Sequence, residues 1–186
     1  MICWKSDKIR PGESQHEAGV RLRDEMLRAL CAIPSPSVIA ELGQKPRLAH
    51  RTDISFSVSH SGSVVICAIS FPGTARMDGL RVICGSSDAP EVGADVERVR
   101  DVSEAPRLRR IARRFFPEGE AARLDALPDA DCPRAFCEIW TAMESYVKRT
   151  GEGFARGFAP VDLTHVRRIT DSVESDGETY IISVTF

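Results

Sequence analysis

Apolar residues recur at helical spacing in four segments of the chain. This spacing predicts helices over residues 16–32, 103–116, 118–127 and 134–150. The last is the clearest, because an apolar stripe runs along its length and Gly151, a suitable C-terminal cap, follows it. The stripe consists of Phe136, Trp140, Met143 and Val147.

A β-hairpin is the simplest interpretation of the segment between the first two helices. Residues 54–58 alternate apolar and polar as a half-buried strand does, and residues 64–69 are an apolar run. The tetrapeptide Ser-His-Ser-Gly at 59–62 lies between them and, by composition, predicts the turn.

A long excursion separates this hairpin from the next strand. Residues 71–90 are rich in Gly, Ser, Asp and Pro, with a short apolar island at 80–84 that predicts one extra edge strand. Residues 92–96 are expected to form a strand, and residues 178–186 alternate as a final strand. Strands and helices therefore occur throughout, and we expect an α+β fold.

The composition is that of an ordinary globular protein. The chain has 186 residues, of which 42% are hydrophobic and 28% charged, and its net charge is -2. That charge argues against bulk attraction to nucleic acid or to membranes. The six cysteines form no CxxC pair, and neither a signal peptide nor an apolar membrane span is visible. A reducing cytoplasm is the expected location.

Two groups of acidic residues are candidates for metal chemistry. Asp95 and Glu97 are two apart on a predicted strand, so their side chains leave the same face. Such a pair suits magnesium, although a solvated strand face is the plainer interpretation. Glu144 lies one helical turn before Lys148. Periodicity does not distinguish an ordinary surface ion pair from a third metal ligand or general base beside a phosphate-binding lysine.

Five ordered sequence blocks resemble the 4'-phosphopantetheinyl transferases of the larger, pseudo-symmetric kind, typified by the surfactin-synthetase enzyme. The blocks are Lys45-Pro46, Phe56-Ser57-Val58-Ser59-His60-Ser61-Gly62, Gly93-Ala94-Asp95-Val96-Glu97, Arg114-Phe115-Phe116, and Trp140 to Lys148 followed by Gly151-Glu152-Gly153-Phe154. They correspond in order to the family's KP loop, SHSG segment, G-x-D-x-E strand, RFF helix and W-x-x-KE-x-x-x-K helix.

The resemblance implies a fold, an activity and partners. The fold would be a pseudo-two-fold pair of small sheet-plus-helix halves, residues 1–90 and 91–186, packed as one compact unit around a coenzyme A cleft. The activity would be magnesium-dependent transfer of the phosphopantetheine arm of coenzyme A to a serine of an acyl or peptidyl carrier protein. Adenosine 3',5'-bisphosphate would be released. Carrier proteins of this kind are acidic, and the two-halved relatives act as monomers.

The resemblance also implies roles for particular residues. Magnesium would be held by Asp95, Glu97 and Glu144. Glu144 would also be the base for the carrier serine, and Lys148 would contact the transferred phosphate. The adenosine-side phosphates would be contacted by Lys45, Ser59 and His60. Without the family, His60 is more plainly a turn residue and Lys45 a loop lysine.

Two features of the sequence depart from the family pattern. Met143 occupies the position of the family's KE lysine, which predicts weaker transfer unless Met143 simply packs in the core. It also keeps open a second interpretation, a non-catalytic relative that binds coenzyme A or a carrier protein. The segment that would hold the family's adenine- or phosphate-side arginine cannot be aligned with this sequence. Three arginines are candidates for that role, Arg21, Arg23 and Arg28.

Arginines crowd the polar side of the predicted 103–116 helix. They are Arg107, Arg109, Arg110, Arg113 and Arg114. A solvated helix face is the leading interpretation, and steering of an acidic carrier protein is the functional alternative. Nucleic-acid binding is poorly supported, because the chain as a whole is slightly acidic and carries no reader motif.

Overall fold

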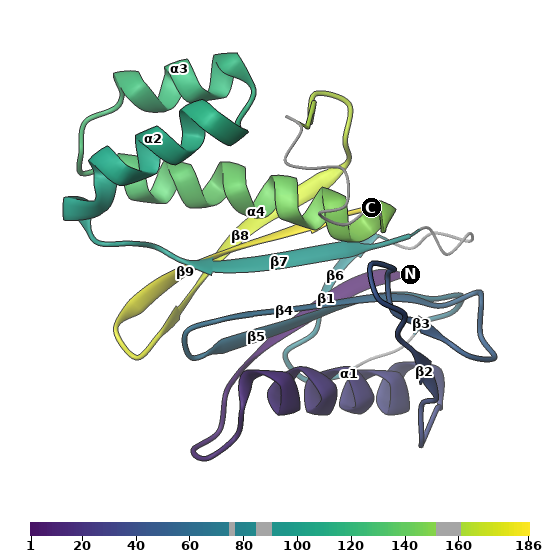
Figure 1. The fold of residues 1–186 in the computed structure, drawn as a ribbon. Helices are drawn as coiled ribbons and strands as arrows, with labels where there is room; N and C mark the ends of the chain where they lie inside the picture. The colour runs from purple at the N-terminus through teal and green to yellow at the C-terminus, as the bar shows by residue number, and fades with distance from the viewer. Residues whose placement is uncertain (75–76, 85–90, 152–160) are drawn as a thin grey trace.

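Two antiparallel sheets pack face to face, with helices on their outer sides (Figure 1). The structure is a computed structural model, and it describes residues 1–74, 77–84, 91–151 and 161–186. The first sheet has the strand order β4-β5-β1-β6 and the second the order β7-β9-β8. Helix α1 covers the first sheet and α4 covers the second, while α2 and α3 lie beyond α4 (Figure 1).

The strands of both sheets are short. Those of the first sheet are β1 (Ile2–Lys8), β4 (Ser55–Ser61), β5 (Val64–Ser70) and β6 (Arg81–Cys84). Those of the second are β7 (Gly93–Arg98), β8 (Arg168–Ser175) and β9 (Glu178–Thr185). A separate two-stranded ribbon consists of β2 (Val38–Ile39) and β3 (Arg47–Leu48) and carries the Lys45-Pro46 loop between its strands.

The predicted helices are all confirmed within two residues. They are α1 (Gln15–Cys31), a short 3-10 turn (Val102–Glu104) that leads into α2 (Ala105–Phe115), α3 (Glu118–Ala126) and α4 (Cys132–Thr150). Helix α1 starts at a capping box, in which the Ser14 hydroxyl accepts the Glu17 N–H and the Glu17 carboxylate accepts the Ser14 N–H. Helix α4 ends at Gly151, whose φ of 71° is the left-handed conformation of a C-terminal cap.

The predicted hairpin is confirmed, but the predicted turn at 59–62 is wrong. Ser59, His60 and Ser61 continue β4 and pair with Ile66, Val65 and Val64 of β5. Only Gly62 and Ser63 form the turn, because Gly62 has a φ of 53° and lies against the Tyr180 ring, where a Cβ would meet the hydroxyl at 2.5 Å. Ser59 and His60 therefore point to opposite faces of the sheet.

Three further predicted strands are confirmed, β6, β7 and β9, and four strands were not predicted, β1, β2, β3 and β8. The apolar island at 80–84 forms the edge strand β6, which pairs with β1. β1 is apolar over residues 2–4 and polar over residues 5–8, and β8 is a half-exposed edge strand with mixed polarity, so neither alternates cleanly.

Three apolar clusters hold these layers together. One lies between α1 and the first sheet, and another lies among α2, α3 and α4. The third lies between the two sheets and draws Ile2, Trp4 and Ile66 from the first and Val96, Tyr180 and Ile182 from the second. The two sheets therefore share a core. In the described part of the chain, no helix is both long and apolar enough to span a membrane.

Candidate active site

A row of serines on β4 faces strand β7. Ser55, Ser57, Ser59 and Ser61 alternate along β4, so their hydroxyls lie on one face, and the first three are buried. β7 is an edge strand, and its free N–H groups need acceptors. The serines accept two of them, Ala94 N–H at Ser57 Oγ (2.9 Å) and Arg98 N–H at Ser61 Oγ (3.1 Å). Ser55 Oγ also accepts the N–H of Val92, just before β7 (3.2 Å).

Helix α4 packs directly against the start of β7. A Cβ on Gly93 would lie 1.8 Å from the Ser145 carbonyl oxygen, so only glycine permits this approach. The contact places Glu144 and Lys148 of α4 beside the carboxylates of β7. The first residue of the G-x-D-x-E block therefore has a packing role, which the sequence alone did not reveal.

Asp95 is the most buried of the three candidate metal ligands. Asp95 is only 4% exposed. Oδ1 accepts hydrogen bonds from Lys148 Nζ (2.6 Å) and from Ser59 Oγ (2.7 Å). Oδ2 is buried and has no hydrogen-bond partner among the described residues. A buried carboxylate oxygen without a donor is unfavourable unless a cation or solvent fills the place.

Glu97 and Glu144 are held at raised pKa values by the same surroundings. Burial and then the charge of Asp95 raise the pKa of Glu97, against the Ser61 hydroxyl, which donates to Oε2 at 3.0 Å. Burial, followed by the charge of Asp95, raises the pKa of Glu144 to about 7, while Lys148 opposes the shift. The three predicted carboxylates thus lie close enough to repel one another.

These residues fit a magnesium ion in chemistry but do not form a ready-made cage. The donors are all carboxylate oxygens, Asp95 Oδ2 lacks a partner, and a cation would relieve the mutual repulsion. Within the described ranges, however, no three His, Cys, Asp or Glu side chains converge closely enough to hold a metal by themselves. The magnesium assignment to Asp95, Glu97 and Glu144 stays a prediction.

A cavity of about 630 Å³ opens beside Glu144 and Lys148. Its wall comes from α1, the loop before β3, β4 and α4, and much of it is apolar, including Val20, Phe56 and Val147. Basic side chains are spread around it, namely His16, Arg23, Lys45, His60 and Lys148. Such a mixture suits an elongated ligand with both apolar and anionic parts.

Two of the three residues predicted to contact the adenosine-side phosphates line the cavity. His60 is exposed and lines the cavity. The Ser59 hydroxyl lies on the opposite face of β4 and binds Asp95 and Lys148, so its predicted phosphate contact is not supported by this arrangement. Lys45 lines the cavity, but its ammonium donates to Ser55 Oγ (2.9 Å), the Val92 carbonyl (2.7 Å) and the Glu91 carboxylate.

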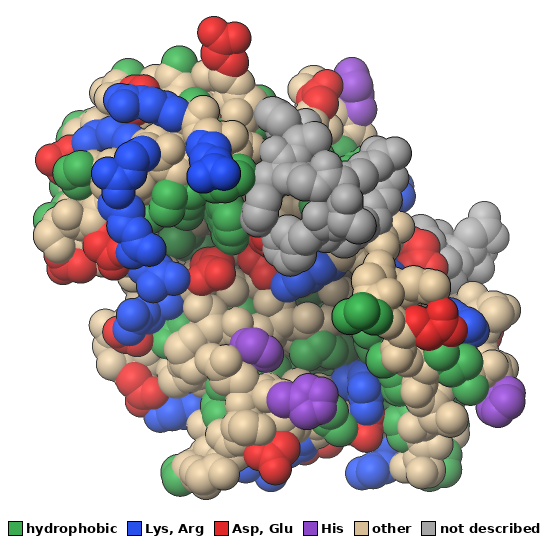
Figure 2. All heavy atoms as spheres, viewed as in Figure 1, with side chains coloured by type: hydrophobic (Ala, Val, Ile, Leu, Met, Phe, Trp, Pro, Cys, Tyr) green, Lys and Arg blue, Asp and Glu red, His purple; other side chains and the backbone are tan. Residues whose placement is uncertain are grey.

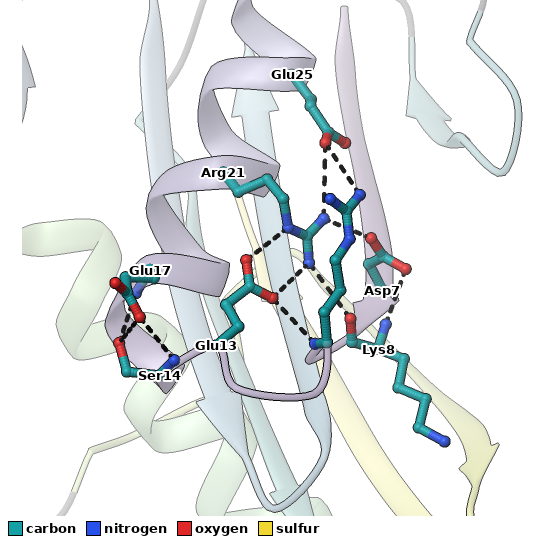
Figure 3. A network of polar contacts seen from close by, with 8 residues as sticks. Asp7, Lys8, Glu13, Ser14, Glu17, Arg21 and Glu25 are labelled. Atoms are coloured by element: carbon teal, nitrogen blue, oxygen red, sulfur yellow. Dashed lines mark hydrogen bonds and ion pairs between the residues drawn. The ribbon is translucent and has the colours of Figure 1, made fainter.

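Of the three candidate arginines, only Arg23 faces the cavity. Arg21 is enclosed by the carboxylates of Asp7 (2.7 Å) and Glu13 (2.7 Å), with Glu25 nearby, and ties α1 to β1 (Figure 3). This pairing lowers the pKa of Glu13 to about 2. Arg28 is exposed on α1. Arg23 stacks over the Phe56 ring at 5.7 Å and lines the cavity, as does His16, which the sequence analysis missed.

Met143 packs in the core, as the simpler interpretation predicted. It is 6% exposed and belongs to the cluster among α2, α3 and α4. With Ile139 and Ala142 it lines a second cavity, on a different helix face from Glu144 and Lys148. Trp140 is also structural, because it stacks on Phe136 at 5.7 Å. Glu152, Gly153 and Phe154 of the last sequence block lie outside the described residues.

The arginine face of α2 is partly committed to the fold. Arg109 donates to the Leu127 carbonyl (2.7 Å) and pairs with Asp129 (2.5 Å), and Arg113 pairs with Asp125 (2.9 Å). These contacts fix α3 against α2. Arg110 and Arg114 are exposed, and Figure 2 shows basic side chains gathered over this part of the molecule.

Comparison with known proteins gives the same family as the residue pattern. The sequence profile of the 4'-phosphopantetheinyl transferase superfamily matches residues 91–186. The chain therefore belongs to the 4'-phosphopantetheinyl transferase superfamily.

Alignments with individual relatives cover more than half of this chain but a smaller share of each relative's own length. The chain is 30% identical over 115 residues to the 4'-phosphopantetheinyl transferase HetI of Nostoc sp., covering 60% of this chain and 40% of that protein. It is 29% identical over 123 residues to Sfp of Bacillus subtilis, covering 66% and 43%. A putative 4'-phosphopantetheinyl transferase of Synechocystis sp. is 28% identical over 82% of this chain and 56% of its own length. The matched segments thus span about half of these relatives or less.

Proposed function

We propose that the chain catalyses magnesium-dependent transfer of the 4'-phosphopantetheine arm of coenzyme A to a serine of an acyl or peptidyl carrier protein. One observation carries the proposal: Asp95 keeps a buried Oδ2 that has no partner among the described residues, beside Glu97, Glu144 and Lys148 and next to a cavity lined by basic groups. Family membership supports the reaction class. The similarity to HetI and Sfp, both 4'-phosphopantetheinyl transferases, supports phosphopantetheine as the transferred group.

In this proposal Asp95, Glu97 and Glu144 hold the magnesium ion. When bound, the ion would neutralise charge on the pyrophosphate of coenzyme A and on the leaving phosphate. The free Oδ2 of Asp95 supports its assignment as a ligand, since Oδ1 is already saturated by Ser59 and Lys148. The pyrophosphate would complete the coordination, as is usual for magnesium at phosphate-transfer sites.

The chain's own groups then account for proton movement and charge. The carrier serine oxygen forms a bond to the phosphorus of the arm as the bond to adenosine 3',5'-bisphosphate breaks, and the serine proton passes to the Glu144 carboxylate. Glu144 lines the cavity beside Lys148, which supports its assignment as the proton acceptor. The Lys148 ammonium, 2.6 Å from Asp95 in this structure, lies on the cavity wall and would stabilise the transferred phosphate.

The basic groups of the cavity would bind the adenosine-side phosphates. His60 is exposed there, and Arg23 supplies a guanidinium on α1. Lys45 would join them only by leaving Glu91, whose carboxylate now binds it. Burial lowers the pKa of Lys45, and the hydrogen bond and charge of Glu91 oppose this shift. An incoming phosphate would take the place of Glu91 as the anionic partner of Lys45.

The proposal extends to organisation and partners. An acidic carrier protein would approach the exposed arginines of α2, and the chain would act as a monomer in the cytoplasm. The two halves, 1–90 and 91–186, would be related by a pseudo-two-fold axis. That relation is supported by a helix on the outer side of each sheet, although the two sheets differ in strand order.

A non-catalytic relative that binds coenzyme A or a carrier protein is the second candidate. Two observations favour it, the apolar residue at Met143 and the engagement of Lys45 by Glu91. A panel of apo carrier proteins incubated with coenzyme A, magnesium and this protein distinguishes the two. Mass spectrometry should find the added arm on at least one carrier. Coenzyme A binding without transfer to any carrier would favour the binding protein instead.

A further inference from the structure

We propose that Ser59 and Ser61 are positioning residues that orient the carboxylates of Asp95 and Glu97 toward the magnesium ion. The inference rests on the proposed function, because it concerns the same site. It assigns to the serines of β4 a task beyond joining the two sheets.

The two hydrogen bonds of the Ser61 hydroxyl can run in only one direction. Its Oγ accepts the Arg98 N–H at 3.1 Å, so its own proton is available to Glu97 Oε2 at 3.0 Å. A backbone N–H cannot accept, and a carboxylate cannot donate when ionised. The hydroxyl therefore fixes one oxygen of Glu97 and leaves Oε1 for a ligand.

Ser59 repeats this arrangement at Asp95. Its Oγ accepts from Lys148 Nζ at 2.8 Å and donates to Asp95 Oδ1 at 2.7 Å. Oδ1 receives a second hydrogen bond from the same ammonium at 2.6 Å. With Oδ1 saturated and the residue buried, Oδ2 is the oxygen left for a cation. Both serines thus act on metal-ligand orientation as outer-shell partners do.

Ser57 is the serine of this row that binds the backbone of β7 without a hydrogen bond to a carboxylate of the G-x-D-x-E block. It is buried on the same face of β4 and accepts the Ala94 N–H at 2.9 Å, but its hydroxyl donates to no carboxylate among the described residues. Ser57 and Ser61 therefore share the structural task of binding an N–H of β7. Only Ser61 and Ser59 add a hydrogen bond to an acidic side chain of the G-x-D-x-E block.

The test is the affinity of the full chain for Mn²⁺ alone, measured by the loss of the free-ion electron paramagnetic resonance signal. Ser59→Ala and Ser61→Ala should each weaken binding about tenfold, the lower end of the range for outer-shell partners. Ser57→Ala is the matched control and should bind as the wild type does. Ser61→Thr keeps the hydroxyl and should restore affinity, which separates loss of the hydrogen bond from loss of folding. Thermal unfolding confirms that each variant is folded.

Unchanged Mn²⁺ affinity in folded Ser59→Ala and Ser61→Ala would overturn the positioning role. An equal loss in Ser57→Ala would also overturn it, because sheet packing alone would then explain the effect. If these results come with arm transfer by the wild type, only the positioning inference fails. Absence of Mn²⁺ binding by the wild type, together with absence of transfer, would contradict the inference and the proposed function alike.

Discussion

At the scale of single residues, the site is defined by how each charge is compensated. Lys148 and Ser59 donate to one oxygen of Asp95, and the other has no hydrogen-bond donor in the part of the chain that the structure describes, whereas Glu144 is largely buried beside two like charges. Lys45 is fully engaged by neighbours of its own chain. The same residue types therefore differ in availability for reasons that only the three-dimensional arrangement shows.

The raised pKa of Glu144 predicts how stability depends on pH in the absence of metal. Because the folded-state pKa is about 7 and the ordinary value is 4.5, folding favours the protonated form. The stabilisation is complete at low pH and is lost as the pH rises from about 4.5 to 7. Urea unfolding with a chelator should show Glu144→Gln gaining on the wild type between pH 5 and pH 8. A constant difference between the two proteins at both pH values would contradict the shift.

Replacement of Met143 by lysine should lower stability without raising any transfer rate. The side chain is 6% exposed and packs among α2, α3 and α4, so an ammonium there loses solvation, at a cost of about 1–3 kcal/mol. Met143→Leu keeps the volume and should cost less than about 1.5 kcal/mol. Chemical denaturation measures both. A stable Met143→Lys variant with faster transfer would instead mean that position 143 reaches the phosphates.

At the scale of elements, the site depends on close approach between α4 and β7. Gly93→Ala would place a Cβ 1.8 Å from the Ser145 carbonyl oxygen, where helix backbone cannot yield easily. We expect a loss of about 3 kcal/mol or more in the free energy of unfolding, measured by denaturant titration.

A second glycine provides the control for that substitution. Gly119 lies in α3 with nothing within 4 Å of the added Cβ, so Gly119→Ala should change stability by no more than about 1 kcal/mol. Equal effects of the two substitutions would mean that the contact between β7 and α4 does not constrain position 93.

Sequence periodicity predicts the amphipathic elements well, and the reasons for its failures are local. The helices and the hairpin follow from apolar spacing, and the family motifs give the candidate carboxylates. The SHSG segment looks like a turn by composition, yet Ser59 and Ser61 belong to β4 because they pair with β5, and Ser61 also accepts the Arg98 N–H of β7. The sequence also does not show that Ser59 and His60 serve opposite faces, or that Glu91 engages Lys45.

At the scale of the whole molecule, a two-sheet core brings residues from both halves to one site. Ser59 and His60 come from the first sheet, and Asp95 and Lys148 from the second half. Helix α2 lies beyond α4 (Figure 1). Its residues Arg110 and Arg114 are exposed. The proposal therefore assigns catalysis to the cavity beside Glu144 and Lys148 and partner recognition to a separate surface on α2.

Charge reversal on α2 tests the recognition surface. Arg110→Glu should raise the apparent KM for an acidic carrier protein about tenfold at low salt, and the difference should shrink at high salt through screening. Arg28→Glu makes the same charge change on α1 and should leave this KM unaltered. Steady-state transfer assays at two salt concentrations measure both variants. Equal behaviour of Arg110→Glu and Arg28→Glu would exclude steering by α2.

The most direct test of the central claim is the rate of arm transfer by wild type and by Glu144→Gln, followed by intact-protein mass spectrometry of an apo carrier with coenzyme A and magnesium. Glutamine keeps the shape of the side chain but neither accepts the serine proton nor contributes charge to the acidic site. We predict modification of the carrier by the wild type and a rate lower by about 100-fold or more in the variant. A Glu144→Gln variant that transfers the arm as fast as the wild type would contradict the account.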